Sequence, residues 1–249
     1  MRILLINPNT TESMTREIHE AAVSVAAAGT EIVSVTSPIG ANTLECIQEE
    51  LCASIGVMQL IHEAELNDPP DAYIIGCYGD PALDAAREIT DKPVIGIAQA
   101  SMYMAAQIAA KFSIITDPPS CFVAMEQLVA KYGMQDYLAS VRGTPLTIEE
   151  YEEDYERSLL EMTKAARRAV EEDRAEAICL GCAGMVSFTK QLQEDLGVPV
   201  IDGVVAAVKM AEGFVTLGLG TSKICTYEYP PKKQYQGVPE VIRGGRSAT

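Results

Sequence analysis

Two cysteines have matching surroundings at distant points of the chain. Cys77 lies in the stretch IIGCYGDP and Cys182 in CLGCAGMV, and in both a glycine precedes the cysteine at the end of an apolar run. A thiol at a strand-to-helix turn is approached by backbone N–H groups and a helix N-terminus, which favour the thiolate. If one such thiol removes a proton from a carbon while another returns a proton to the opposite face, a stereocentre is inverted without a cofactor.

Polar residues that follow the first two predicted strands are candidate substrate contacts. The stretch NPNTTES places Asn9, Thr10 and Thr11 after the first strand, where their amide and hydroxyl groups can bind a polar substrate. Asn9 and Glu12 also have the spacing of a helix-capping box, and the two roles are compatible. Thr43 follows the second strand, where it can reach the same site or begin the next helix.

Two features beside the cysteines have structural interpretations. Asp80 precedes Pro81, which suits a first helical turn, so capping of that helix is favoured over proton transfer by Asp80. Cys179 and Cys182 have the C-x-x-C spacing of redox-active thioredoxin-like proteins. Cys179 falls inside a predicted strand, however, and Ile74 takes its place in the other cysteine segment. We therefore expect Cys179 to be a packing residue.

Short apolar runs alternate with longer segments of helical period, which predicts βαβ units and a mainly parallel sheet. The predicted strands are Ile3–Ile6, Glu31–Thr36, Ala72–Gly76, Val94–Ile97, Ser113–Ile115, Leu138–Arg142, Ala177–Gly181 and Val198–Ile201.

The order of these elements repeats. RILLINPNTTESM from Arg2 matches KFSIITDPPSCFVAM from Lys111, VSVTSP matches SVRGTP, DAYIIGC matches EAICLGC, and KPVIGIAQASMYMAA matches VPVIDGVVAAVKMAE. The nearly constant offset indicates a duplicated α/β half of about 105 residues. Two such halves commonly pack about a pseudo-two-fold axis, with ligands at the carboxyl ends of the strands. Cys77 and Cys182 should then face one cleft, with sulfurs about 7–9 Å apart so that a planar substrate fits between them.

Composition excludes several classes of protein. A net charge of −16 disfavours binding to nucleic acid or an anionic membrane. No apolar run is long enough to span a bilayer and the first residues lack the features of a signal peptide, so a cytoplasmic protein is expected. Seven cysteines in such a protein are not a disulfide framework, and only His19 and His62 are available for a histidine-rich metal site or a Ser-His-Asp triad. We expect no metal.

Two segments carry no predicted chemistry. The acidic run Glu149–Glu156 is typical of the solvated face of a helix. The tail from Thr226 is rich in proline and predicts an extended strap over the surface or a frayed end.

The chain resembles the aspartate/glutamate/hydantoin racemase superfamily, most closely its hydantoin and allantoin racemase branch. The resemblance rests on INPNTT, CYGDPALDAARE, PVIGIAQA, FSIIT and LGCAGM, which together span most of the chain except the tail. It implies two pseudo-symmetric α/β domains around a cleft, with the last helices returning to the first domain. We expect a first domain of 1–97 plus 206–249 and a second of 98–205.

The resemblance also implies an activity. Family members need no cofactor and use two cysteines as an acid/base pair, which by motif position are Cys77 and Cys182. We expect racemisation of a hydantoin-type cyclic ureide at the carbon next to a carbonyl, by a protein that forms a homo-oligomer. An amino-acid racemase and a non-catalytic small-molecule binder remain alternatives. Further candidate substrate contacts lie in the two cysteine segments and after the fifth strand: Tyr78, Gly79, Asp80, Thr116, Ala183 and Gly184.

Overall fold

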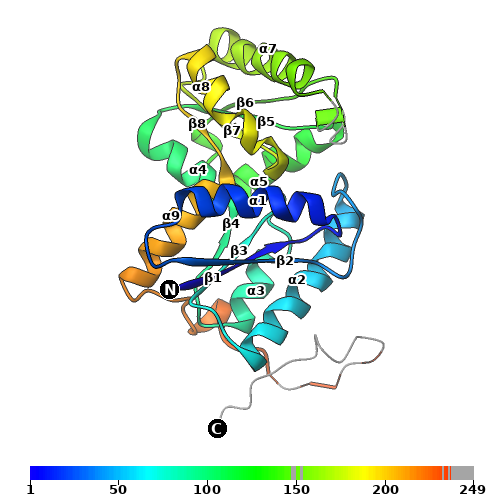
Figure 1. The fold of residues 1–249 in the computed structure, drawn as a ribbon, viewed down its shortest axis with the longest axis vertical. Coiled ribbons are helices and arrows are strands. Elements are labelled where there is room, and N and C mark those ends of the chain that lie inside the picture. Colours follow the sequence, from blue (N-terminus) through cyan, green and yellow to red (C-terminus); the bar gives the residue numbers. More distant parts are fainter. Residues whose placement is uncertain (147–149, 152–153, 232, 235, 237–249) are drawn as a thin grey trace. The chain divides into compact units, whose positions relative to one another are not determined.

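The computed structural model describes residues 1–146, 150–151, 154–231, 233–234 and 236 (Figure 1). Its strands are β1 (Arg2–Asn7), β2 (Glu31–Thr36), β3 (Ala72–Ile75), β4 (Val94–Gly96), β5 (Phe112–Ile115), β6 (Leu138–Arg142), β7 (Ala177–Leu180) and β8 (Val200–Ile201). Its α-helices are α1 (Glu12–Val25), α2 (Ile47–Asn67), α3 (Leu83–Ile89), α4 (Ile97–Ile108), α5 (Phe122–Lys131), α7 (Tyr155–Asp173), α8 (Thr189–Leu196) and α9 (Gly203–Thr216). Short 3₁₀ helices are η1 (Pro119–Cys121), η2 (Gln135–Tyr137), η3 (Ala183–Phe188) and η4 (Cys225–Tyr227).

The first sheet is four-stranded and parallel, in the order β2-β1-β3-β4. Its central strand β3 is buried along its whole length because helices cover both faces. Figure 1 shows α1 over one face and α2 with α3 over the other. This arrangement is the expected result of right-handed crossovers between parallel strands.

The second sheet repeats the first. It is also parallel and four-stranded, in the order β6-β5-β7-β8, so each strand corresponds to the one four places earlier. The prediction of two duplicated parallel α/β halves is confirmed at the level of the sheets. All the strands predicted from the sequence are present among the described residues, with ends that differ by at most two residues.

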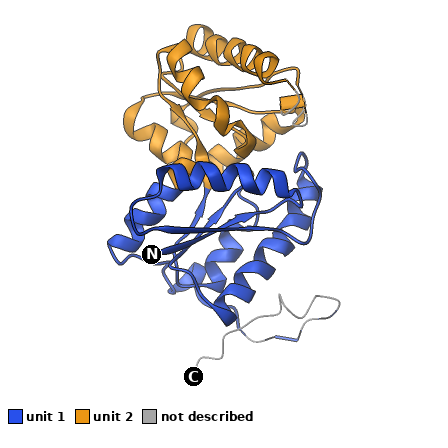
Figure 2. Cartoon of the chain, in the orientation of Figure 1, with its two compact units in different colours: residues 1–76, 80–96, 208–249 blue, residues 77–79, 97–207 orange. Residues whose placement is uncertain are grey.

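The chain divides into two compact units (Figure 2). The first comprises residues 1–76, 80–96 and 208–249, and the second comprises 77–79 and 97–207. The short segment 77–79 follows a strand of the first sheet but belongs to the second unit, which also contains Cys182. The domain boundaries expected from the sequence stay a prediction.

Helix α7 shows how the sequence determines packing in the second unit. Met162, Ala165, Ala166 and Ala169 recur at helical spacing and are buried, whereas the intervening charged residues are exposed. The alanines allow the helix to lie close to the sheet. The buried side of α7 joins an apolar cluster with β7 and η3, which is where the chain passes Cys182.

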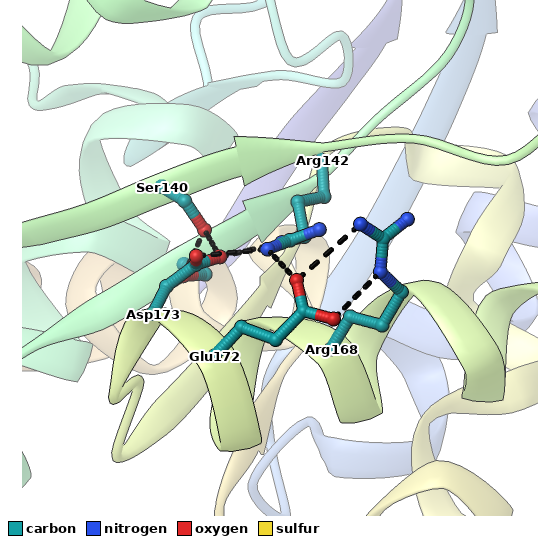
Figure 3. Close-up of polar contacts among 6 residues, drawn as sticks. Ser140, Arg142, Arg168, Glu172 and Asp173 are labelled. Atoms are coloured by element: carbon teal, nitrogen blue, oxygen red, sulfur yellow. Dashed lines mark hydrogen bonds and ion pairs between the residues drawn. The ribbon is translucent and has the colours of Figure 1, made fainter.

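Charged side chains connect strand β6 to the end of α7 (Figure 3). Arg142 donates to Asp173 and, at 2.7 Å, to Glu172, while Ser140 also donates to Asp173. Arg168 donates to Glu172 at 3.1 Å from one turn earlier in the helix. These pairs raise the pKa of Arg142 and lower the pKa of Asp173. The network fixes the sheet's edge strand β6 to a helix.

The residues from Lys223 to Tyr227 lie as a strap over α3, which agrees at Tyr227 with one of the two outcomes expected for the tail from Thr226. Lys223 Nζ donates to the carbonyl oxygens of Arg87 at 2.9 Å and Glu88 at 3.0 Å, at the end of that helix. The hydroxyl of Tyr227 donates to Asp84 at 3.1 Å. A cation at a helix C-terminus satisfies unpaired carbonyl groups and complements the helix dipole.

Candidate active site

The first cysteine corner forms where β3 ends beside β1. The N–H of Gly76 donates to Ile6 O at 2.8 Å, which extends the ladder by one residue. A Cβ at Gly76 would lie 2.9 Å from Ile18 Cδ1 and 3.1 Å from Ile6 O, so a side chain there would press into the core. Glycine therefore lets β3 end against its neighbour, and Cys77 follows with a half-buried side chain.

The second corner repeats this construction where β7 ends beside β5. The N–H of Gly181 donates to Ile115 O at 2.7 Å. A Cβ at Gly181 would lie 2.5 Å from Thr116 Cβ, closer than folded proteins tolerate. Cys182 follows, half-buried, at the N-cap of η3. The hydroxyl of Thr116, a predicted substrate contact, donates to Gly181 O at 3.2 Å, so this side chain also supports the corner.

The two corners occupy corresponding places in the two sheets. Strands β3 and β7 hold the same position in the strand order. Each is followed by a glycine, Gly76 or Gly181, at which neighbouring atoms leave no room for a Cβ. Cys77 and Cys182 also belong to the same compact unit. Gly79, Ala183 and Gly184 are half-buried in the turns that follow the cysteines, consistent with backbone groups near a ligand. The predicted separation of the two sulfurs stays a prediction.

Cys179 is a packing residue, as expected. Its side chain is 0% exposed, and its Sγ donates to Ser101 O at 3.7 Å. Burial raises the pKa of the Cys179 thiol to about 12, which rules out an acid/base or redox role near neutral pH. Tyr78, a predicted substrate contact, is also buried, with its hydroxyl 2.8 Å from Ser101 Oγ. The hydroxyl of Tyr78 thus has a hydrogen-bond partner inside the second unit.

The loops after β1 and β2 bring the predicted polar contacts of the first unit together. Thr10 N donates to Ala41 O at 3.0 Å, and Thr11 Oγ1 donates to Asn42 O at 2.8 Å. Thr43 is half-buried in the same β2–α2 loop, before the helix, and its hydroxyl donates to a carboxylate two residues later at 3.1 Å. These loops therefore place the hydroxyl-bearing residues at the carboxyl edge of the first sheet.

The predicted capping box at Asn9 is wrong. Helix α1 begins at Glu12 with Thr11 at its N-cap and no side-chain cap. Asn9 Oδ1 instead accepts from Thr11 N at 2.9 Å and from Asn7 Nδ2 at 2.8 Å. Asn7 lies at the end of β1 and is buried, so its amide needs internal partners, and the asparagine pair provides them. Asn9 thus shapes the β1–α1 loop.

The predicted capping of α3 by Asp80 is wrong as well. Ala82 is the N-cap of α3, and the helix has no side-chain cap. Asp80 is buried, with a φ of 46°, and its carboxylate lies against Gly96. A Cβ at Gly96 would be 2.3 Å from Asp80 Cγ. The acid therefore packs against the end of β4 instead of the helix that follows it.

The described residues hold no group of three or more histidine, cysteine, aspartate or glutamate side chains that could bind a metal ion. Within the same residues, no helix combines the length and the apolar character needed to cross a membrane.

Comparison with known proteins identifies the family. The family model described as Asp/Glu/Hydantoin racemase matches residues 3–211. The chain belongs to this family. It is 48% identical to a hydantoin racemase of Pseudomonas sp. (strain NS671) over 249 residues, which cover 100% of this chain and 99% of that one. It is 43% identical to a hydantoin racemase of Rhizobium meliloti over 95% of this chain and 98% of the relative. The resemblance found in the sequence is confirmed.

Solved structures of the family agree with the fold. An allantoin racemase from Klebsiella pneumoniae superposes with a TM-score of 0.93 at 40% identity, covering 97% of this chain and 98% of that one. A glutamate racemase from Francisella tularensis has a TM-score of 0.63 at 18% identity over 89% of this chain and 84% of that one, which shows the fold alone. The chain thus shares its fold with solved racemase structures.

Two buried polar residues of the second unit are missing from the predicted set. Asp117 follows Thr116 and is 4% exposed, and Tyr151 is 6% exposed. Tyr151 stands in the acidic run that was predicted to be a solvated helix face, which is wrong for this residue; positions 149, 152 and 153 of the run lie outside the described residues. The signal for its burial is the tyrosine itself, a large, mainly apolar side chain among carboxylates.

Proposed function

We propose that the chain is a cofactor-independent racemase of a hydantoin-type cyclic ureide, such as a 5-substituted hydantoin or allantoin. The observation that carries this proposal is the glycine–cysteine corner, built twice at corresponding strand ends of a chain that is 48% identical to a hydantoin racemase. Cys77 and Cys182 are the proposed acid/base pair.

The proposed chemistry requires one thiolate and one thiol. The thiolate takes the proton from the ring carbon next to a carbonyl, and the electron pair moves into that carbonyl to give an enolate. The thiol on the opposite face then gives its proton to the same carbon, so the configuration is inverted and the two cysteines exchange protonation states. Backbone N–H groups beside the thiols, at Gly79 and Gly184, are suited to stabilise the enolate oxygen.

The remaining predicted contacts complete the proposed site. Asn9, Thr10, Thr11 and Thr43 provide amide and hydroxyl groups from the first unit. Thr116 and the small residue Ala183 belong to the second cysteine corner, where a flat ring can approach the backbone. The proposed contacts lie at the carboxyl edges of their sheets, in accordance with the general location of ligands in open α/β folds. The homo-oligomer expected from the sequence stays a prediction.

Proton exchange in D₂O tests the pair. With one pure hydantoin enantiomer, the wild-type enzyme should place deuterium on the inverted product. Cys77→Ser and Cys182→Ser should each abolish racemisation, because a hydroxyl is far too weak an acid at neutral pH, yet each should exchange the ring proton of one enantiomer only, and of opposite ones. Cys52→Ser is the matched control because that thiol is exposed on α2.

Spontaneous exchange of the acidic ring proton is subtracted with an enzyme-free sample. Racemisation at the wild-type rate by both folded serine variants would refute the two-thiol mechanism. Equal turnover of free glutamate or aspartate by the wild-type enzyme would favour the amino-acid racemase alternative, and tight hydantoin binding without any exchange would favour the binding protein.

A further inference from the structure

The short segment that carries Cys77 is held in the second unit by its middle residue, Tyr78. The phenol of Tyr78 is buried, and its hydroxyl lies 2.8 Å from Ser101 Oγ on α4. Ser101 is fully buried, and its own hydroxyl donates to Ala98 O at 3.0 Å. A serine hydroxyl has one hydrogen, so the phenol is the donor in the bond to Ser101. Because a buried donor needs an acceptor, this bond determines where the phenol lies.

Ser101 is in turn attached to the strand that leads to Cys182. The thiol of Cys179 donates to Ser101 O at 3.7 Å. Cys179 lies in β7, where it is paired with Ile114 of β5 on one side and with Ile201 of β8 on the other. A buried strand that is paired on both sides opens rarely. The phenol beside the first thiol is thus connected, through one buried serine, to the strand that ends at the second thiol.

The first corner needs such a connection and the second does not. Cys77 follows β3, a strand of the first unit, yet it belongs to the second unit. Cys182 belongs to the same unit as β7, the strand before it, so its own sheet positions it. Ala183 stands after Cys182 where Tyr78 stands after Cys77, and its methyl group has no hydrogen to donate. The tyrosine is therefore a feature of the corner that its own sheet does not position in the second unit.

We propose that Tyr78 is a positioning residue for Cys77, and that its hydrogen bond to Ser101 holds the first thiol at a fixed place in the unit that carries Cys182. The inference rests on the proposed function, because it assigns both thiols to one acid/base pair. The phenol acts through its neighbour, since its hydroxyl is bonded to a buried serine. Proton transfer requires a group held within about 0.5 Å of its productive place. A loosened Cys77 should therefore slow its own step and leave the step at Cys182 intact.

Racemisation alone does not test this role, because every turnover uses both thiols. Exchange of the ring proton of each hydantoin enantiomer in D₂O does, since a Cys182→Ser protein reports on Cys77 and a Cys77→Ser protein reports on Cys182. Tyr78→Phe is added to each of them. It keeps the ring, and Ser101 keeps Ala98 O as its partner, so the variant should fold. We expect exchange to fall about tenfold in the Cys182→Ser protein and to stay unchanged in the Cys77→Ser protein.

Tyr103→Phe is the matched control. Tyr103 lies on the same helix as Ser101 but two residues later, on another side of α4, and its hydroxyl donates to Tyr132 O at 3.4 Å. Removing this hydroxyl should change exchange in neither single-thiol protein. Ser101→Ala removes the acceptor at the other end of the bond and should reproduce the selective loss at Cys77. It takes the place of Tyr78→Phe if that variant does not fold.

Three results would overturn the proposal. Unchanged exchange in the Cys182→Ser protein would show that the bond has no effect on Cys77. An equal loss in both single-thiol proteins would show a general structural effect. A raised KM for both enantiomers, with unchanged exchange at saturation, would show that Tyr78 contacts the substrate instead.

Failure of the proposed function is seen separately, as a wild-type protein that racemises no hydantoin. Alkylation of each cysteine by iodoacetamide, followed by mass spectrometry without substrate, then decides the positioning role, and it does so as well if the single-thiol proteins exchange nothing. Tyr78→Phe should speed alkylation of Cys77, because a corner without its bond opens more often, and should leave Cys182 unchanged. An unchanged rate at Cys77, or an equal change at both thiols, would contradict the role of Tyr78.

Discussion

Replacing Gly181 by alanine tests whether close contact between strand ends is what requires glycine before Cys182, a proposed catalytic cysteine. The added Cβ would lie 2.5 Å from Thr116 Cβ, 2.8 Å from Ile115 O and 2.9 Å from Thr116 Oγ1. The backbone of Gly181 is outside the left-handed region, so alanine meets no conformational barrier there. The effect of the substitution is therefore due to lack of space.

The cost follows from what the new methyl group would displace. Two of the three contacts are with backbone or with the Cβ of a buried side chain, neither of which can rotate away, so the end of β7 must move from β5. Overpacking of this kind costs about 2–3 kcal/mol of the free energy of unfolding. Because Cys182 is the next residue, the same displacement should lower kcat by about 10- to 100-fold.

Two other glycines provide graded controls. At Gly76 the nearest atom is the flexible end of Ile18, at 2.9 Å, so Gly76→Ala should cost only about 1 kcal/mol. At Gly213, inside α9, nothing lies within 4 Å of the added Cβ, and alanine should stabilise the helix by about 0.5–1 kcal/mol. Urea unfolding followed by circular dichroism gives the three free energies, and racemisation of a hydantoin gives kcat.

The expected order is thus a large loss at Gly181, a small loss at Gly76 and a gain at Gly213. If Gly181→Ala unfolds at the wild-type urea concentration and keeps full activity, the close approach of the strands does not explain the glycine. An equal loss at Gly181 and Gly213 would show that the loss at Gly181 does not come from the contacts of its added Cβ.

Three further substitutions have definite expected outcomes. Cys179→Ala should keep racemase activity and lose about 1 kcal/mol of unfolding free energy by urea titration, because it removes a buried sulfur; a loss of activity would contradict its packing role. Lys223→Met should lower the unfolding free energy by about 1 kcal/mol, since its carbonyl partners on α3 lose a donor, and unchanged stability would show that the strap contributes nothing. Burial raises the pKa of Asp202 to about 6, and its Oδ2 has no partner among the described residues. The aspartate therefore favours the folded state most below its unfolded pKa, and this contribution is lost as pH rises toward 6. Asp202→Asn should remove that loss between pH 4 and 6, as measured by thermal unfolding across this range, and an unchanged pH profile would refute the assignment.

The fold was predictable because its signals are local and repeated. Each strand is a short apolar run bounded by turn residues. Because both faces of such strands are buried, apolar and polar residues do not need to alternate along them. The repeat added a second line of support, since each strand predicted in one half has a counterpart at the matching place in the other half. The strand ends shifted by one or two residues because the last ladder bond depends on the neighbouring strand, as at Val200.

The errors concern side chains whose partners are distant in sequence. Asn9 and Glu12 have capping-box spacing, but buried Asn7 competes for the same side-chain oxygen. Asp80 precedes a helix, yet its carboxylate fills the space over Gly96. In each case a local rule was overridden by a tertiary contact that no short window contains. Tyr151 is a similar case, since its partner Asp117 is thirty-four residues away.

The two halves place a carboxylate at the end of their outer strands, β4 and β8, in different ways. The pairing of β3 with β4 and of β7 with β8 shows that Gly96 and Asp202 hold corresponding places at the ends of their strands. In the first half Gly96 leaves room for the carboxylate of Asp80. In the second half the strand end provides the carboxylate itself, and Asp202 Oδ1 accepts from Val205 N at 2.8 Å.

A carboxylate is thus kept near the start of the helix that follows each outer strand, but it comes from the cysteine corner in one half and from the strand in the other. The acid of the first corner, Asp80, has Met185 at the corresponding position in the second. In the first half the strand end has no room for a side chain, because a Cβ at Gly96 would overlap Asp80. The duplicated fold has therefore kept the positions of its thiols while exchanging the charges around them.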